Sequence, residues 1–156
     1  MFGQNIPLQT IAVGSRHYCG LAVDGAAYCA GDYTGGVRGT GGATGEFAEP
    51  DLVPNQVAGG LSYSELAVGL GNSCGLSVGQ AYCWGLNHVG QVGNGSTINN
   101  ILVPVLVEGG ATYRAISAGL NHACAIRTSG ALYCWGSGQL GTGAPQVSTI
   151  PVRVHF

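Results

Sequence analysis

Short apolar segments alternate with glycine-rich turns along the chain, and the whole pattern occurs three times. Each copy has an apolar segment ending in glycine, a Cys-initiated segment, a Tyr-Cys segment, a loop of the form Gly-x-x-Gly-x-Gly, and a Pro-x-x-Val segment. The copies span residues 8–57, 61–107 and 111–154 of a single domain, residues 1–156. A period of about fifty residues is typical of solenoids, propellers or arrays, in which neighbouring repeats share a core.

The apolar segments are rich in Val, Ile, Tyr and Cys and are bounded by Gly, Asn and Pro, which predicts β-strands throughout. No stretch keeps a helical period for more than two turns. The prolines of the last segments suit the start or edge of a strand, where no ladder donor is needed: Pro54, Pro104 and Pro151. We therefore predict an all-β fold.

Six cysteines form one pair per repeat, and their spacing predicts β-hairpins. If the cysteines of a pair are directly opposite, repeats one and three leave three-residue loops ending in Gly25 and Gly130, and repeat two leaves the two-residue loop Val78-Gly79. The one-residue deletion then falls in the turn and preserves the register. Opposed cysteines on antiparallel strands lie within disulfide range. We predict three disulfides: Cys19–Cys29, Cys74–Cys83 and Cys124–Cys134.

Disulfides imply an oxidising compartment, so we expect a secreted, extracellular protein. Buried free thiols in a cytosolic propeller are the alternative. A zinc site is a weaker one, because the chain has no Cys-x-x-Cys spacing. The first four residues lack the basic and apolar regions of a signal peptide, so we expect that the signal is removed or is not included in this sequence.

Charge is sparse in this chain and excludes some classes of partner. Charged residues make up 8% of the sequence, the net charge is −2, lysine is absent, and the five arginines are scattered singly. A nucleic-acid binder needs a basic footprint, and an anionic membrane surface attracts basic clusters, so neither partner is expected. No apolar run is long enough to span a bilayer, which excludes membrane insertion.

The third repeat resembles the regulator-of-chromosome-condensation family in residues 118–126 (AGLNHACAI), 130–136 (GALYCWG), 138–143 (GQLGTG) and 151–154 (PVRV). The second repeat matches as well. The first departs from the pattern, with Ala30 where the others have Trp84 and Trp135, and with Val37-Arg38 in place of Gln-Val or Gln-Leu.

The resemblance implies a β-propeller whose blades are four-stranded antiparallel sheets, with each sequence repeat offset from the blade so that neighbouring repeats share strands. This chain is similar to a cysteine-rich, secreted bacterial variant of that family. Characterised members include an exchange factor for a nuclear GTPase and a plant photoreceptor. A shared fold does not by itself give this chain either of these functions.

The sequence offers little evidence for a catalytic or metal-binding site. His17 and His122 occupy one repeat position, where Asn72 stands in repeat two, so a structural hydrogen bond is favoured over a metal site, and no cofactor, metal or catalytic residue is expected. Glu46, Glu49 and Asp51 could bind calcium but are better explained as a solvated loop.

The aromatic residues of repeat two and the glycine loops are expected to act in packing. With Cys74 opposite Cys83, Tyr82 and Trp84 share a face opposite the small residues Gly75 and Ser77, so we expect the tryptophans to pack between blades rather than line a sugar site. The glycine loops are expected where one blade approaches the next. The long loop 31–49 is expected to project outward and to contact a ligand or another subunit.

Three repeats cannot close a propeller, which needs about four to eight blades. The pattern would almost continue if Phe156 were joined to Met1, which predicts head-to-tail association into a ring or a filament. We expect a strand of one copy to complete a sheet of the next, through these assembly residues: Ile11, Gly14, Pro151, Val152 and Val154. The leading hypothesis is a secreted, non-enzymatic structural subunit of an extracellular multimer, such as a filament or tube. The alternatives are a ligand-binding propeller module, lectin-like or protein-binding, or a fragment of a longer propeller.

Overall fold

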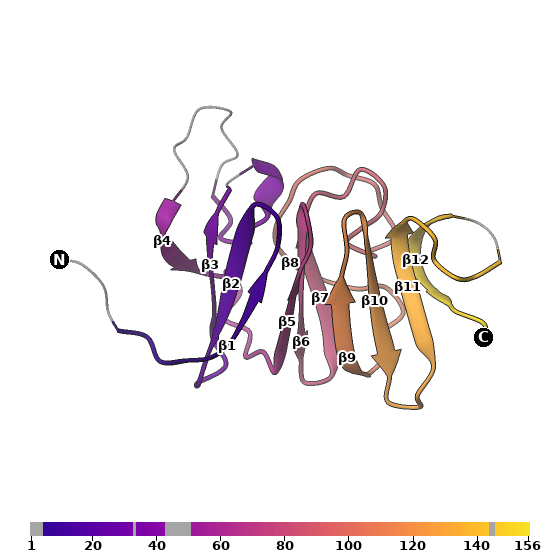
Figure 1. The fold of residues 1–156 in the computed structure, drawn as a ribbon, viewed down its shortest axis with the longest axis horizontal. Helices are drawn as coiled ribbons and strands as arrows, with labels where there is room; N and C mark the ends of the chain where they lie inside the picture. Colours follow the sequence, from indigo (N-terminus) through magenta and orange to yellow (C-terminus); the bar gives the residue numbers. More distant parts are fainter. Residues whose placement is uncertain (1–4, 33, 43–50, 144–145) are drawn as a thin grey trace.

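The chain folds into three four-stranded antiparallel β-sheets that stand side by side (Figure 1). The computed structural model describes residues 5–32, 34–42, 51–143 and 146–156, and the backbone alone of residues 51 and 52. The predicted all-β architecture of four-stranded blades is confirmed. We refer to the sheets as blades 1, 2 and 3 in chain order.

The strands of each blade follow one another along the chain. Blade 1 contains β1 (Leu8–Val13), β2 (His17–Ala22), β3 (Ala27–Gly31) and β4 (Asp51–Gln56). Blade 2 contains β5 (Glu65–Val68), β6 (Asn72–Ser77), β7 (Gln80–Gly85) and β8 (Ile101–Leu106). Blade 3 contains β9 (Tyr113–Ala118), β10 (His122–Arg127), β11 (Leu132–Ser137) and β12 (Val147–Arg153). A 3-10 turn, η1 (Thr34–Gly36), follows β3.

Each blade is built from one sequence repeat. With the repeats bounded at residues 8–57, 61–107 and 111–154, no described strand is shared between two repeats. The first strand β5 of blade 2 contacts both β1 and β9, so the first strands lie innermost, and β4, β8 and β12 lie at the outer edges. Within the described residues no strand of blade 3 pairs with blade 1, so the blades form an open row.

The glycine that ends each innermost strand lets neighbouring backbones touch. A Cβ atom on Gly14 would collide with the carbonyl oxygen of Gly69, and a Cβ atom on Gly69 would collide with that of Gly119. At Gly14 and Gly69, therefore, no larger residue fits without moving the main chain, whereas a Cβ atom on Gly119 would meet the side chain of His122. The close approach of backbones explains why the first two apolar segments end in glycine.

The hairpins have the register that the cysteine spacing predicted. The paired cysteines are directly opposite on β2–β3, β6–β7 and β10–β11, and the structure joins the three predicted pairs by disulfides. The loops of blades 1 and 3 end in Gly25 and Gly130, whose φ angles are 88° and 92°, as a left-handed third residue requires. The register in turn fixes which side chains share a face.

Each blade has a disulfide face, which carries the cysteine pair, and an aromatic face, which carries the tyrosine before the second cysteine. The disulfide face of blade 1 packs against the aromatic face of blade 2, and the same arrangement joins blade 2 to blade 3. The first of these cores contains Cys19, Leu21, Ala27, Cys29, Val57, Tyr63 and Trp84. The hydrophobic core of the protein thus lies between blades.

In blades 2 and 3 a tryptophan joins the blade to the glycine loop of the repeat before it. The indole Nε1–H of Trp84 donates to the carbonyl oxygen of Val37 at 2.9 Å, and Trp135 donates to Gln91 at 3.0 Å. Both indoles are fully buried, as expected for packing between blades. One detail of the prediction was wrong, since the residue opposite Trp84 is Ser73 and not Gly75 or Ser77.

A buried histidine joins blade 1 to blade 2. Ser73 Oγ donates to the Val37 carbonyl oxygen at 2.9 Å, so the His17 Nε2–H donates to Ser73 Oγ at 2.6 Å. Burial lowers the pKa of His17 to about 4, and the charge of Asp32 opposes this only in part. The structural role favoured for His17 is thus borne out. Asn72 does not share it, because its buried amide has no hydrogen-bond partner among the described residues.

The turn of blade 2 gives a test of backbone strain. Val78 has φ 49° and its neighbour Gly79 has φ 75°, the signs of a type I′ turn, in which a β-branched residue is disfavoured. Val78 is 92% exposed, so its side chain contributes little packing. We expect Val78→Asn to raise the free energy of unfolding by about 1 kcal/mol in urea titration. Val23→Asn, at an exposed turn position without positive φ, is the control, and an equal gain there would contradict the strain.

Because His17 is buried in its neutral form, we expect the free energy of unfolding to fall in acid. The unfolded chain binds a proton at this imidazole below about pH 6.5, whereas the folded chain resists protonation until about pH 4. Its contribution is therefore complete above pH 6.5 and falls as the pH drops towards 4, by about 2–3 kcal/mol. We expect His17→Asn to flatten the dependence of the free energy of unfolding on pH over this range. Parallel curves for the two proteins would rule out His17 as the source.

Candidate functional site

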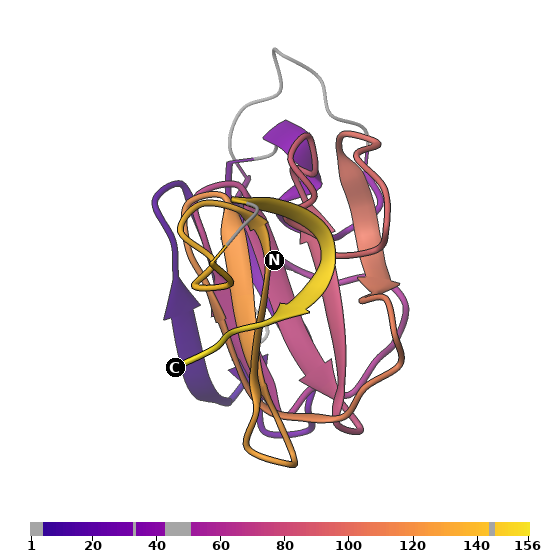
Figure 2. The same cartoon turned by 90° about the vertical axis from the view of Figure 1, so that its right-hand side faces the viewer.

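Two blade faces have no neighbouring blade, and they are of opposite type. The aromatic face of blade 1, here called the leading face, includes Leu8, Ile11, Val13, Tyr18, Tyr28 and Val53. The disulfide face of blade 3, here called the trailing face, includes Ile126, Leu132, Val152 and Val154. The two faces lie at opposite ends of the row of blades, and Figure 2 views the molecule from the blade 3 end.

The leading face is apolar and open. Leu8, Ile11 and Val13 on β1 are 49%, 59% and 70% exposed. In the same register positions, Tyr113 and Ile116 of blade 3 are buried against blade 2. Contiguous exposed apolar area of this kind is typical of an interaction surface.

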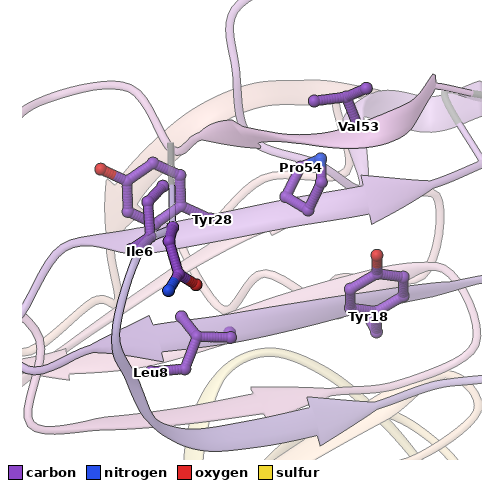
Figure 3. A pocket seen from close by; sticks show the side chains of 8 residues that line it. Ile6, Leu8, Tyr18, Tyr28, Val53 and Pro54 are labelled. Carbon is purple, nitrogen blue, oxygen red and sulfur yellow. The ribbon is translucent and has the colours of Figure 1, made fainter. Parts of the chain in front are cut away.

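A groove of about 490 Å³ runs across the leading face (Figure 3). All four strands and the segment before β1 contribute to its lining: Asn5, Ile6, Leu8, Tyr18, Gly20, Tyr28, Val53 and Pro54. Its floor is formed where Leu8 crosses Gly20, since a Cβ atom on Gly20 would meet the Leu8 methyl groups. The polar groups of the lining side chains are two phenol hydroxyls and one amide, so the lining contains no carboxylate, imidazole or thiol.

The leading face differs from the aromatic faces inside the molecule at two linked positions. In blade 2, Tyr63 packs on Trp84 with ring centroids 6.0 Å apart, and burial raises the pKa of the Tyr63 hydroxyl. Blade 3 repeats this aromatic pair. Blade 1 has Leu8 in place of the tyrosine and Ala30 in place of the tryptophan. Both members of the pair are therefore absent from the leading face.

The trailing face keeps the residue types that are buried inside the molecule. Ile126, Leu132 and Val154 stand where blade 1 has Leu21, Ala27 and Val57. Those three residues of blade 1 are buried against blade 2, whereas their counterparts on blade 3 are partly exposed. A shallow hollow of about 600 Å³ lies at the edge of this face, lined by residues 129–133 and 153–156. The trailing face thus has the composition of a blade interface without its second blade.

The predicted assembly residues do not form one site. Ile11 lies on the leading face, and Val152 and Val154 lie on the trailing face, whereas Gly14 lies between the innermost strands. Pro151 neighbours Val152 in β12 and so faces the other side of the sheet.

The structure bears on the expectation of strand addition in one respect. β12 pairs with β11 of its own chain, with Val152 opposite Cys134, so blade 3 already has its fourth strand. Blade 3 therefore needs no strand from another copy to be complete, and the two open faces are the surfaces that have no neighbouring blade.

The structure gives no further support to the other candidate sites, which are the histidine position, the acidic residues and the long loop of repeat one. His122 packs against Gly119, and within the described residues no three His, Cys, Asp or Glu side chains gather as a metal site would require. Glu46 and Glu49 lie outside the described residues, as does much of loop 31–49, and only the backbone of Asp51 is described. No helix in the described part of the chain is both long and apolar enough to cross a membrane.

The sequence reasoning missed Tyr18, which lines the groove. Tyr18 lies directly opposite Ala30, where blade 2 has Ser73 opposite Trp84. A signal was present, since opposing Cys19 to Cys29 also opposes Tyr18 to Ala30, and Ala30 already departed from the tryptophan pattern. The large and small residues have exchanged strands on this face.

Comparisons with known proteins agree with this architecture. Residues 78–126 and 113–142 match profiles of the regulator of chromosome condensation (RCC1) repeat. The chain superposes on human WBSCR16 with a TM-score of 0.86 at 21% identity, covering 98% of this chain and 39% of that protein. Prp20p from Saccharomyces cerevisiae superposes with a TM-score of 0.85 at 22% identity, covering 96% of this chain and 38% of Prp20p.

A more distant likeness is to the ectodomain of the receptor kinase CR4 from Physcomitrella patens, with a TM-score of 0.59 at 24% identity, covering 86% of this chain and 30% of that one. The chain spans about two fifths of the length of WBSCR16 and Prp20p. The repeat profiles, the three four-stranded blades and these neighbours lead to one conclusion: the chain contains RCC1-type repeats over residues 78–142 and has the fold of an RCC1-type β-propeller.

Proposed function

We propose that this chain is a secreted, non-enzymatic, protein-binding propeller module that assembles with copies of itself, blade face on blade face. The observation that carries the proposal is that its two open faces are unlike and complementary. One is a disulfide face and the other an aromatic face, which are the two partners in each interface inside the molecule.

The internal interfaces provide the template for the contact. In each, apolar side chains of a disulfide face pack into an aromatic face, and the area removed from water supplies the stabilisation. Placing the trailing face of one copy on the leading face of another repeats that arrangement. The contact is heterologous, so it closes into a ring or grows into a filament according to the rotation between copies.

The other parts of the proposal have separate support. Three disulfides are consistent with an extracellular protein. The absence of acids, bases and thiols from the lining of the groove supports a binding role over catalysis. A protein partner is supported by the neighbour Prp20p, whose structure was reported with its binding to Gsp1p and histones.

A mixing experiment tests the heterologous contact. Ile11→Asp places a charge on the leading face and Val154→Asp places one on the trailing face, so each variant retains only one intact face. By sedimentation velocity at micromolar concentration, we expect the wild type to form multimers and each variant to be monomeric. An equimolar mixture should give heterodimers and nothing larger, because both remaining intact faces are then used.

Val23→Asp, at an exposed hairpin turn, is the matched control and should leave the multimers unchanged. Circular dichroism and thermal unfolding would establish that the variants are folded. A monomeric wild type, or folded variants that stay monomeric when mixed, would contradict self-assembly.

A further inference from the structure

We propose that Tyr18 determines the specificity of the contact between copies, by donating a hydrogen bond from its hydroxyl to the backbone carbonyl of Gln139 in a second copy. This inference rests on the proposed function and names the polar contact at its centre. The occupant of the leading face is then the trailing face of another copy together with its glycine loop, residues 138–143.

The internal interfaces show what the contact requires. At each of them a glycine loop places one carbonyl group on a buried indole N–H of the next blade: Val37 on Trp84 and Gln91 on Trp135. The following glycine packs directly on the indole, since a Cβ atom on Gly93 would meet the ring of Trp135. A buried carbonyl without a donor costs about 1–3 kcal/mol, so a further interface of this type needs a donor at the same place.

The third glycine loop offers the equivalent carbonyl. Gln139 takes the position of Gln91, it is exposed, and no described residue donates to its carbonyl. The second glycine of the loop accepts the same backbone hydrogen bond as its counterparts, from His155 to Gly141 as from Glu108 to Gly93. The loop is thus anchored on the trailing face much as the internal loops are anchored.

The leading face lacks the indole donor but has a phenol beside its position. Ala30 replaces the tryptophan, and Tyr18 lies directly opposite Ala30 on the same face. Figure 3 shows the Tyr18 ring with its hydroxyl directed to the side where Val53 and Pro54 of β4 lie. No hydrogen bond joins that hydroxyl to another described residue.

Blade 2 provides a precedent for a donor at this position. Ser73, the counterpart of Tyr18, donates its hydroxyl to the same Val37 carbonyl that accepts from Trp84. A hydroxyl at the position of Tyr18 is therefore already directed at a loop carbonyl inside this molecule. The longer tyrosine also fills part of the space left by the absent indole, so one residue replaces both the donor and the bulk.

The exchange makes the contact between copies chemically distinct from the internal interfaces. A loop that docks on the leading face meets a phenol on β2, whereas the internal loops meet an indole on β7 or β11. The donor comes from a different strand, so the best position of the docked loop differs as well. The loops of repeats one and two already dock on Trp84 and Trp135 of their own chain, so the loop of repeat three is the one that remains to meet Tyr18.

The heterodimer of Ile11→Asp and Val154→Asp isolates this contact, because only the Val154→Asp partner presents a leading face. Adding Tyr18→Phe to that partner should raise the Kd by about 5- to 10-fold in surface plasmon resonance, the effect expected of one lost hydrogen bond. Tyr28→Phe removes the other phenol hydroxyl of the groove and is the control, with no expected change in Kd.

A compensating pair gives a second readout. Ala30→Trp alone should weaken binding by more than about 10-fold, because the indole and the Tyr18 ring compete for one space. Tyr18→Ser combined with Ala30→Trp recreates the Ser73 and Trp84 arrangement and should restore the Kd to within about 3-fold of the parent heterodimer.

The outcomes separate this inference from the proposed function. If folded parent variants form no heterodimer, self-assembly itself fails. If the heterodimer forms and Tyr18→Phe leaves its Kd equal to that of the Tyr28→Phe control, assembly stands and the role of Tyr18 is overturned. Failure of the double variant to recover affinity, when Ala30→Trp alone is weakened, would equally overturn it.

Discussion

A blade of this protein buries both of its faces only when another blade lies on each side. The hydrophobic core lies between sheets, so the stability of each blade depends on its neighbours. The contact between a buried indole and a loop carbonyl of the preceding repeat fixes how two blades meet. Much of the rest of the structure follows from these junctions, including the aligned glycines of the innermost strands and the two unlike faces at the ends of the row.

The register of the hairpins and the type of fold were accessible from the sequence. One cysteine pair in each repeat defines which residues are opposite, and from that register the disulfides, the turn lengths and the two faces of each blade follow. The resemblance of the repeated motifs to the regulator-of-chromosome-condensation family then implied four-stranded propeller blades. Local patterns sufficed here because hairpin pairing is set by residues close together in the chain.

Contacts between repeats were not accessible in the same way. The bond from Trp84 to Val37 joins residues 47 positions apart, and it depends on how a loop folds over the next sheet. The pattern alone also did not show that β12 pairs with β11 of its own chain, so that blade 3 is complete without a strand from another copy. Tyr18 was overlooked because each departure of repeat one from the pattern was considered singly, although Tyr18 and Ala30 are opposed in one ladder.

The most direct test of blade-on-blade assembly is a cryo-electron microscopy map of the native protein at a resolution that shows side chains. We expect the disulfide face of blade 3 in one copy to lie on the aromatic face of blade 1 in the next, with residues 138–143 covering Tyr18. A map in which copies meet through identical faces, or in which β12 adds to β1 of a neighbour as a fifth strand, would contradict it.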